Sequence, residues 1–466
     1  MSKNTHRIES DSLGEIKVPT DSYFGSNTMR ALMNFQISDE LAPSVFREAL
    51  GLVKMAALES NYKLKIISKK EYTAIKKSCI DFIAGKFNED FILDTFQAGA
   101  GTSYNMNANE IIANRANQIL KGKKGEYKFI HPNNHVNYGQ STNDVIPTAT
   151  KLATLLSTPE LLSEIAALEE AFETISIKHQ KTVKVGRTHL QDAVPISLGQ
   201  SFDSYREALK KSREHIANQS TSLQTLGIGG TAVGTGINTN PKYRDLVVKN
   251  LSELTGIQFE SGNNLTEMAN NFSDFMNFSS GLRNLATNLL NISLDLKLMN
   301  SGPKTGFGEI TLPPVQPGSS IMPGKINPSI PECLEMICMQ VLGNDKVIEL
   351  SVQRANFELN VFCPLIMKNL LSSMEILTNG LKMFRTLAIK GLKVNTKQIK
   401  AEYEGSLATA TALAPHIGYN ETSEIVKAAL KSGSSIKEEV EKRKLLPPKK
   451  LEKILSVENT TKPNKL

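Results

Sequence analysis

The sequence contains no tryptophan and has four cysteines in 466 residues. The cysteines stand apart and form no CxxC pair and no spacing typical of a metal site; they are Cys79, Cys333, Cys338 and Cys363. They therefore predict reduced, buried thiols in a cytoplasmic protein rather than a disulfide framework. An HExxH motif and a carboxylate cluster are also missing, so we expect no metal site and no built-in cofactor.

Long apolar runs are absent as well. A membrane span needs about 18 consecutive apolar residues, and no such stretch occurs, so we expect no membrane association. The polar, mixed-charge segment Met1 to Ser12 does not read as a secretory signal peptide. The net charge of +7 includes a basic stretch at residues 442–450, but no aromatic-interleaved basic run accompanies it. We interpret this charge as a solvated surface and expect no nucleic-acid partner.

The residues that are present predict a mainly α fold. The hydrophobic fraction of 40% and the charged fraction of 22% are those of a globular protein, and the length predicts two or three domains. Two segments repeat apolar residues at steps of four and three, which is the seam of long packed helices. The first seam is Leu161, Ile165, Leu168, Phe172 and Ile175, and the second is Cys363, Met367, Leu370, Met374, Leu377, Leu381 and Phe384.

These patterns divide the chain into three parts. Residues 1–140 alternate short helical patterns with turns and predict a mixed, mainly helical N-terminal domain. Residues 141–392 predict a central bundle of long helices. Residues 393–466 have shorter patterns with breaks at Gly405, Pro415 and Gly418, and predict a small C-terminal helical domain.

One long segment interrupts the predicted bundle. Residues 302–332 contain five glycines and seven prolines among 31 residues. A loop of this length between long helices is uncommon and usually functional, and its glycine content makes it a candidate lid.

Three shorter interruptions carry polar residues where we expect helix boundaries. They are residues 99–103 (Gly-Ala-Gly-Thr-Ser), 140–144 (Gln-Ser-Thr-Asn-Asp, ahead of Pro147) and 186–192 (Gly-Arg-Thr-His-Leu-Gln-Asp, before Pro195). Ser, Thr, Asn and Asp are good N-caps, and a helix start offers free N–H groups and partial positive charge to a carboxylate. Each interruption taken singly is as compatible with a cap as with a binding site.

Together these segments resemble the aspartase/fumarase superfamily. Residues 318–327, Gly-Ser-Ser-Ile-Met-Pro-Gly-Lys-Ile-Asn, fit the GSSxMPxKxN motif of that superfamily at every fixed position. From Tyr23 to about Tyr419 the segments follow the order of the superfamily. The resemblance implies a lyase with three domains and a central bundle of long helices, which eliminates a small group beside a carboxylate.

Within the superfamily, some segments of the chain resemble aspartases and others resemble fumarases. Residues 99–107 and 140–144 resemble aspartases, which favours elimination of ammonia from L-aspartate to give fumarate. Residues 356–362 (Asn-Phe-Glu-Leu-Asn-Val-Phe) and 229–234 resemble fumarases, as do the departures from aspartase at 354–356 and Cys363. These departures lie away from the matching polar motifs, so we expect them to bear on the substrate more than on the reaction type. A class II fumarate hydratase remains the alternative.

The resemblance also implies roles for individual residues. Ser319 is similar to the general base of the superfamily, and His189, with Glu332 as its partner, and Lys325 complete the catalytic set. Thr188, Lys325 and Asn327, with help from Thr142, would bind the carboxylate that takes up charge. The expected substrate-binding set is Thr102, Ser141, Thr142, Asn143, Thr188, Ser320, Lys325 and Asn327.

The resemblance further implies a homotetramer whose sites are each built from three subunits. The residues add a geometric argument, since a continuous helix over residues 145–180 would be roughly 50 Å long. Asn143 and Thr188 would then share a site only across subunits, whereas a break at Pro159 would fold the helix back. A non-catalytic scaffold protein of the same fold is the remaining reading. It would be favoured if the catalytic residues were lost, and they are present.

Overall fold

The structure is a computed structural model in which residues 5–463 are described. The fold is mainly α and divides into two compact units, each built from three stretches of the chain. Unit 1 comprises Met1–Leu162, Glu214–Ala286 and Met339–Leu377, and unit 2 comprises Ser163–Arg213, Thr287–Cys338 and Thr378–Leu466. The predicted division into three parts with boundaries near 140 and 392 stays a prediction.

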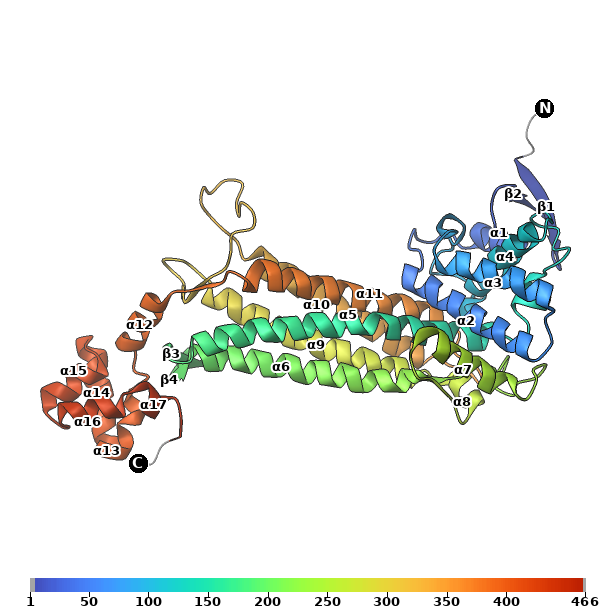
Figure 1. Cartoon of the computed structure of the whole chain (residues 1–466). Helices are drawn as coiled ribbons and strands as arrows, with labels where there is room; N and C mark the ends of the chain where they lie inside the picture. The colour runs from blue at the N-terminus through green and yellow to red at the C-terminus, as the bar shows by residue number, and fades with distance from the viewer. Residues whose placement is uncertain (1–4, 464–466) are drawn as a thin grey trace. The chain divides into compact units, whose positions relative to one another are not determined.

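Five long helices contribute a segment to each unit (Figure 1). They are α5 (Thr142–Lys178), α6 (Leu198–Ser220), α9 (Ser273–Met299), α10 (Ser329–Val352) and α11 (Cys363–Phe384). The predicted seam of α11 is confirmed, because all seven of its residues are buried. In α5 the seam is buried from Leu161 to Phe172, but Ser176 rather than Ile175 is buried in its last turn. An α-helix with 3.6 residues per turn drifts away from a strict 3.5-residue repeat in this way.

α5 is continuous. It runs through both Pro147 and Pro159, so the break that Pro159 allowed does not occur. Ser141 precedes the helix and accepts a hydrogen bond from the backbone N–H of Asn143 at 3.2 Å, while Asp144 accepts one from the backbone N–H of Ser141 at 3.0 Å. This reciprocal pair confirms the N-cap predicted from residues 140–144.

Unit 1 packs around three helices that lie side by side (Figure 1). The helices are α2 (Ser44–Lys63), α3 (Lys69–Ile83) and α4 (Thr102–Ile119). Their core is aromatic, with the rings of Phe46 and Phe91 stacked or tilted against buried Tyr104 at centroid distances of 5.5 and 5.6 Å. A Cβ at Gly51 of α2 would lie 2.9 Å from the ring of Phe82, so this glycine allows α2 and α3 to approach closely. The smaller elements of the unit are β1 (His6–Asp11), β2 (Gly14–Pro19), α1 (Ser26–Asn34), β5 (Thr225–Leu226), α7 (Tyr243–Thr255), β6 (Glu260–Ser261) and α8 (Leu265–Asn270).

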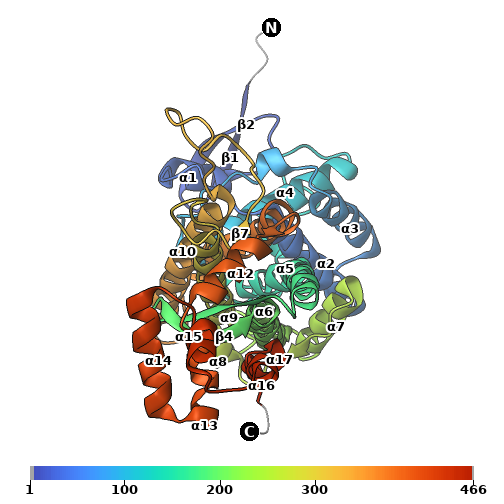
Figure 2. The ribbon, with the colours of Figure 1, turned by 90° about the vertical axis from the view of Figure 1, so that its left-hand side faces the viewer.

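Unit 2 contains an antiparallel hairpin and the C-terminal helices. The hairpin pairs β3 (Val183–Thr188) with β4 (Gln191–Ser197), and a second short pair joins β7 (Ile310–Thr311) to β8 (Lys393–Val394). The C-terminal helices are α12 (Thr396–Gly405), α13 (Ala414–Ile417), α14 (Tyr419–Ser432), α15 (Ile436–Arg443), α16 (Pro448–Ile454) and α17 (Val457–Thr460). Helix α14 contacts both α13 and α15, as Figure 2 shows.

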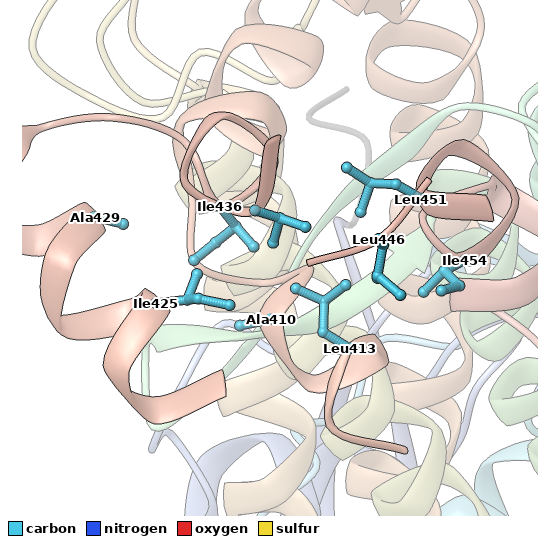
Figure 3. Close-up of a cluster of buried hydrophobic side chains, with 9 residues drawn as sticks. Ala410, Leu413, Ile425, Ala429, Ile436, Leu446, Leu451 and Ile454 are labelled. Carbon is cyan, nitrogen blue, oxygen red and sulfur yellow. The ribbon is translucent and has the colours of Figure 1, made fainter. Parts of the chain in front are cut away.

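The C-terminal helices have an apolar core of their own. Buried residues such as Leu413, Ile425, Ile436 and Leu451 point toward one another from different segments (Figure 3). A capping box in which Ser435 and Glu438 bond reciprocally starts α15. Small helices are only marginally stable alone, so this core is what holds residues 410–455 together.

Among residues 5–463, no helix combines the length and the apolar character needed to cross a membrane.

Candidate active site

The first group of predicted site residues lies at the start of α4, in unit 1. The chain enters this helix through Ala100 and Gly101, whose φ angles are 61° and 85°. The backbone N–H of Ala100 donates to the carbonyl oxygen of Val361 at 2.7 Å. This turn leaves Thr102 exposed in the first turn of α4, while the following residues are buried. The hydroxyl of Thr102 is therefore available to a ligand, whereas the backbone N–H of Tyr104 in the same turn donates to the side-chain oxygen of Gln97 at 3.0 Å.

The second group lies at the start of α5, also in unit 1. Ser141, Thr142 and Asn143 are half-buried in the cap and first turn of the helix. The Asn143 side chain donates to the carbonyl oxygen of Ala232 at 2.8 Å. Behind them, buried Asp144 accepts hydrogen bonds from the backbone N–H groups of Gly229 and Thr231 at 3.1 and 2.9 Å. Burial nevertheless raises the pKa of Asp144 to about 7.

The third group lies on a hairpin rather than at the helix boundary that we expected from residues 186–192. β3 and β4 are joined by His189 and Leu190, whose φ angles of 55° and 58° are those of a two-residue type I′ turn. Neither residue is a glycine, and residues with side chains rarely adopt this left-handed region of backbone conformation. The turn exposes Thr188 and His189 at the tip of the hairpin. Strained backbone of this kind is concentrated at functional sites.

A buried ion network anchors this hairpin. The carboxylate of Glu309, which is 0% exposed, contacts the guanidinium of Arg187 at 2.6 Å and the ammonium of Lys184 at 3.0 Å. Arg187 also donates to Glu402 of α12 at 3.2 Å and lies over the ring of Phe307. The residue directly before Thr188 is therefore bound to two other segments of unit 2.

The fourth group lies in the segment between α9 and α10, which contains no helix from residue 300 to residue 328 (Figure 1). The Ser319 hydroxyl oxygen accepts hydrogen bonds from the backbone N–H groups of Met322 at 2.9 Å and Ile321 at 3.2 Å. Two N–H dipoles directed at one oxygen stabilise negative charge on it. Ser319 is thus placed where its anion would be favoured.

The loop around Ser319 is closed at its base. The backbone N–H of Gly318 donates to the carbonyl oxygen of Lys325 at 2.9 Å, and the Asn327 amide donates to the carbonyl oxygen of Gly318 at 2.6 Å. A Cβ at Gly318 would lie 2.4 Å from the carbonyl oxygen of Lys325, so no side chain fits there. The loop lines a hollow of about 500 Å³.

The cation of this loop is exposed. The Lys325 ammonium donates to the Asn327 amide oxygen at 2.9 Å, and Ser320 is exposed beside Ser319. In the described part of the chain, no hydrogen bond or ion pair joins His189 to Glu332, which lies in the first turn of α10. Their pairing therefore stays a prediction. Of the predicted residues, Thr102 and Ser141–Asn143 belong to unit 1, and the others belong to unit 2.

Comparisons with known proteins agree with this set of motifs. A family model described as Lyase matches residues 14–343, and one described as Fumarase C C-terminus matches residues 410–462. The chain is 41% identical to an aspartate ammonia-lyase from Bacillus sp over 457 residues, covering 98% of each protein. The chain belongs to the aspartase/fumarase superfamily.

Solved structures of this superfamily have the same fold. A fumarate lyase:delta crystallin from Brucella melitensis, bound to cobalt, superposes with a TM-score of 0.94 at 43% identity, covering 97% of this chain and 98% of that one. A class II fumarase from Schistosoma mansoni gives a TM-score of 0.93 at 34% identity, with coverage of 97% and 98%. A class II fumarate hydratase from Wigglesworthia glossinidia brevipalpis is 41% identical over 434 residues, covering 93% of this chain and 94% of that one. The chain is a lyase with the fold that the motifs predicted.

The structure brings two fumarase-like stretches, residues 356–362 and 229–234, against the polar motifs. Val361 accepts the hydrogen bond from Ala100 in the turn before Thr102, and Ala232 accepts the one from Asn143. Both stretches therefore contact predicted substrate-binding segments, although 89 residues separate Asn143 from Ala232.

Sequence reasoning missed two buried charges of this lyase. Glu309 belongs to no motif that we recognised, and the signal for it is that residues 302–331, which are rich in glycine and proline, contain no other carboxylate. Lys54 of α2 is 1% exposed and lies within the apolar run Leu52 to Leu58. A lone lysine in such a run is the signal that would have drawn attention to it.

Proposed function

We propose that this lyase is an aspartate ammonia-lyase, which reversibly eliminates ammonia from L-aspartate to give fumarate. The observation that carries the chemistry is the Ser319 hydroxyl oxygen with its two backbone N–H donors. The choice of aspartate is supported by the residues around Thr102 and Ser141–Asn143, which resemble those of aspartases, and by the identity to aspartate ammonia-lyases over nearly the whole chain.

The difficulty of the reaction is a Cβ–H bond that is a very weak acid. Removal of its proton is feasible if the neighbouring carboxylate takes up the charge as a dianionic enolate. Catalysis therefore requires donors that bind this carboxylate more tightly as charge develops than in the ground state. We assign Thr188, Lys325 and Asn327 to this task, with Thr142 assisting.

In this scheme Ser319 has first released its hydroxyl proton to solvent; its oxyanion then takes the Cβ proton, and the electron pair of the Cβ–H bond moves into the enolate. A hydroxyl is a poor base at neutral pH unless its anion is stabilised, and the N–H groups of Ile321 and Met322 supply that stabilisation. Lys325 adds a positive charge on the same loop. We assign binding of the substrate ammonium to Thr102, Asn143 and His189. The second carboxylate is assigned to the start of α5.

We also propose that the active species is a homotetramer whose sites are shared between subunits. A continuous helix of 37 residues is about 55 Å long, and Thr188 follows shortly after its C-terminal end, which supports a site in which Asn143 and Thr188 come from different subunits. Exposed apolar side chains on the long helices support association with further copies; they are Leu294, Met336, Met339 and Leu350. Sedimentation velocity is expected to show four copies, and an active monomer would refute the sharing of sites.

A second candidate, a class II fumarate hydratase, is favoured by one observation. The fumarase-like stretches that include Ala232 and Val361 contact the segments of Asn143 and Thr102, where the leaving group would bind. Both reactions share the dicarboxylate frame and the enolate, so the proposed roles of Ser319 and Lys325 hold for either. The free thiols of the chain agree with action in the cytoplasm, and we expect a small dicarboxylate, rather than nucleic acid, as the ligand.

The test is to add the purified protein to L-aspartate and, separately, to L-malate, and to follow fumarate by its ultraviolet absorbance. We expect fumarate from L-aspartate alone. Fumarate from L-malate alone would establish the hydratase, and fumarate from neither would refute both assignments.

A further inference from the structure

A buried cation lies behind the predicted substrate-binding segments of unit 1. The ammonium of Lys54 donates hydrogen bonds to three side-chain amide oxygens. These belong to Asn105 at 2.6 Å, Asn137 at 2.9 Å and Gln140 at 3.0 Å. In the described chain, no carboxylate lies within ion-pair distance of Lys54, so dipoles rather than a counter-ion hold the charge. The elimination chemistry described above does not use this group.

The three amides are fixed in the orientation that presents oxygen to the lysine. The Asn137 nitrogen donates to the carbonyl oxygen of Gln140 at 3.1 Å, and the Gln140 nitrogen donates to the carbonyl oxygen of Val136 at 2.9 Å. The Asn105 nitrogen donates to Asn137 at 3.2 Å. Since each nitrogen is committed elsewhere, three acceptors converge on one Nζ atom. An ammonium has three donors and a neutral amine has two, so this geometry selects the charged form.

The same contacts connect Lys54 to both substrate-binding segments. Asn105 lies three residues after Thr102 on α4, and its amide also donates to the Thr142 hydroxyl at 3.3 Å. Asn137 and Gln140 belong to the segment that leads into Ser141. A shift of Lys54 would therefore displace the starts of both α4 and α5.

Burying an ammonium among neutral amides costs stability, because full desolvation is not offset by an opposite charge. Burial lowers the pKa of Lys54 to about 7, and the attraction of Asp144 opposes this effect. A buried charge held by neutral dipoles in this way points to a function that requires the charge. Its partners Asn105 and Gln140 belong to the segments of Thr102 and Ser141, which we assign to the substrate.

We propose that Lys54 is a positioning residue that joins the starts of α4 and α5 and places a fixed positive charge behind the carboxylate-binding end of α5. This inference rests on the proposed binding of a dicarboxylate to these segments. Lys54 does not contact the substrate. It acts on affinity through Asn105 and Gln140 and through its electric field.

The experiment measures succinate binding by isothermal titration calorimetry, because succinate has the dicarboxylate frame and no leaving group. The full-length wild type is compared at pH 6.5 with Lys54→Met and with Lys63→Met. Lys63 is on the same helix, is exposed, and contacts Asn250 outside the cluster. We expect the Kd of Lys54→Met to rise at least tenfold and that of Lys63→Met to stay within twofold, with an unchanged elution volume in size exclusion.

The separate effects on KM and kcat distinguish a positioning role of Lys54 from a merely structural one. Uniform loss of ground-state binding raises KM more than it lowers kcat. We therefore expect KM for the accepted substrate to rise about as much as the succinate Kd, with kcat within about threefold. An unchanged Kd, or a loss of kcat at constant KM, in folded Lys54→Met would overturn the proposal.

Gln140→Glu replaces Lys54→Met if the latter does not fold. Gln140 is half-buried, and a carboxylate there would neutralise the adjacent ammonium while Lys54 remains in place. We expect a succinate Kd at least fivefold above wild type, and a wild-type value would overturn the inference. Failure of the proposed function has a different signature: the wild type binds succinate, Lys54→Met weakens that binding, and the wild type converts neither L-aspartate nor L-malate. A wild type that does not bind succinate would contradict both.

Discussion

The backbone N–H of Met322 donates a hydrogen bond to the hydroxyl oxygen of Ser319 at 2.9 Å, three residues back along the chain. This contact and the parallel one from Ile321 leave the hydroxyl proton free to be given up, because both lone-pair directions are engaged by donors. The two backbone donors are therefore already in place around the Ser319 oxygen before a substrate binds.

Ser319→Ala removes this oxygen and is expected to lower kcat by roughly 100- to 10,000-fold, the range of general acid–base catalysis. KM is expected to change less than about threefold, since the proton is transferred in the transition state. Initial rates of fumarate formation give both constants. Ser320→Ala is the matched control, because Ser320 is the exposed neighbour that we assign to binding, and it should raise KM instead. Near-normal turnover of Ser319→Ala would contradict the assignment of the base.

Lys325→Met is expected to reduce kcat and raise KM together. Lys325 is exposed on the Ser319 loop, and its charge is assigned to the carboxylate that becomes the enolate. One charge-assisted hydrogen bond is worth about 1.5–3 kcal/mol, so kcat/KM should fall roughly 10- to 150-fold. Lys304→Met, which removes another exposed lysine from the segment between α9 and α10, should leave kcat/KM within twofold. Equal effects of the two substitutions would show that net charge alone is responsible.

Local patterns predicted part of this architecture. The cap at Ser141 and the apolar seam of α11 depend on residues a few positions apart, so spacing alone revealed them. The motif around Ser319 identified the loop for the same reason. Features of this kind are encoded within one helix or one turn.

The hairpin and the buried charges depend on residues far apart in the sequence. The turn at His189 and Leu190 lacks the Asn-Gly or Asp-Gly pair that marks a type I′ turn, so we read residues 186–192 as a helix boundary. The contacts of Lys54 with Asn105 and Gln140 span 51 and 86 residues. Nothing in one sequence relates such positions before the fold brings them together.

Glu309→Gln is expected to destabilise the chain. Glu309 is fully buried between Arg187 and Lys184, and removal of its charge leaves two cations without their shared counter-ion. Breaking a buried ion pair by removing one partner costs about 3–5 kcal/mol. Urea unfolding followed by circular dichroism should report that loss in the free energy of unfolding.

The control for this substitution is Glu207→Gln, which removes an exposed partner of Arg206 and should cost less than about 1 kcal/mol. Because Arg187 precedes Thr188, the Glu309→Gln protein should also lose kcat at a temperature where it remains folded. A folded variant with normal stability would show that the network does not anchor the hairpin.

The pH dependence of succinate binding follows from the buried lysine. Burial lowers the pKa of Lys54 to about 7, so its positive charge is present below pH 7 and is lost as the pH rises. Asp144 faces the cluster with a pKa raised to about 7, mainly by burial, and becomes an anion in the same range. The Cys79 thiol stays neutral, because burial raises its pKa to about 12. Both titrations weaken anion binding, and we expect the succinate Kd to rise about tenfold between pH 6.5 and 9.

As the pH rises, the contribution of Lys54 to the free energy of unfolding should increase, although the affinity for succinate decreases. Its pKa is lower in the folded chain than the value of about 10.4 for an unfolded lysine, so between pH 7 and about 10 the unfolded state binds more protons. The Lys54 contribution to stability therefore increases as the pH rises through this window, while affinity for succinate falls. In Lys54→Met the rise of the succinate Kd should shrink to the part that Asp144 causes. Calorimetric titrations of succinate at pH 6.5, 7.5 and 9 give the dependence of Kd on pH for the wild type and for Lys54→Met. If the Kd of the two proteins changes equally with pH, Lys54 is not the titrating group.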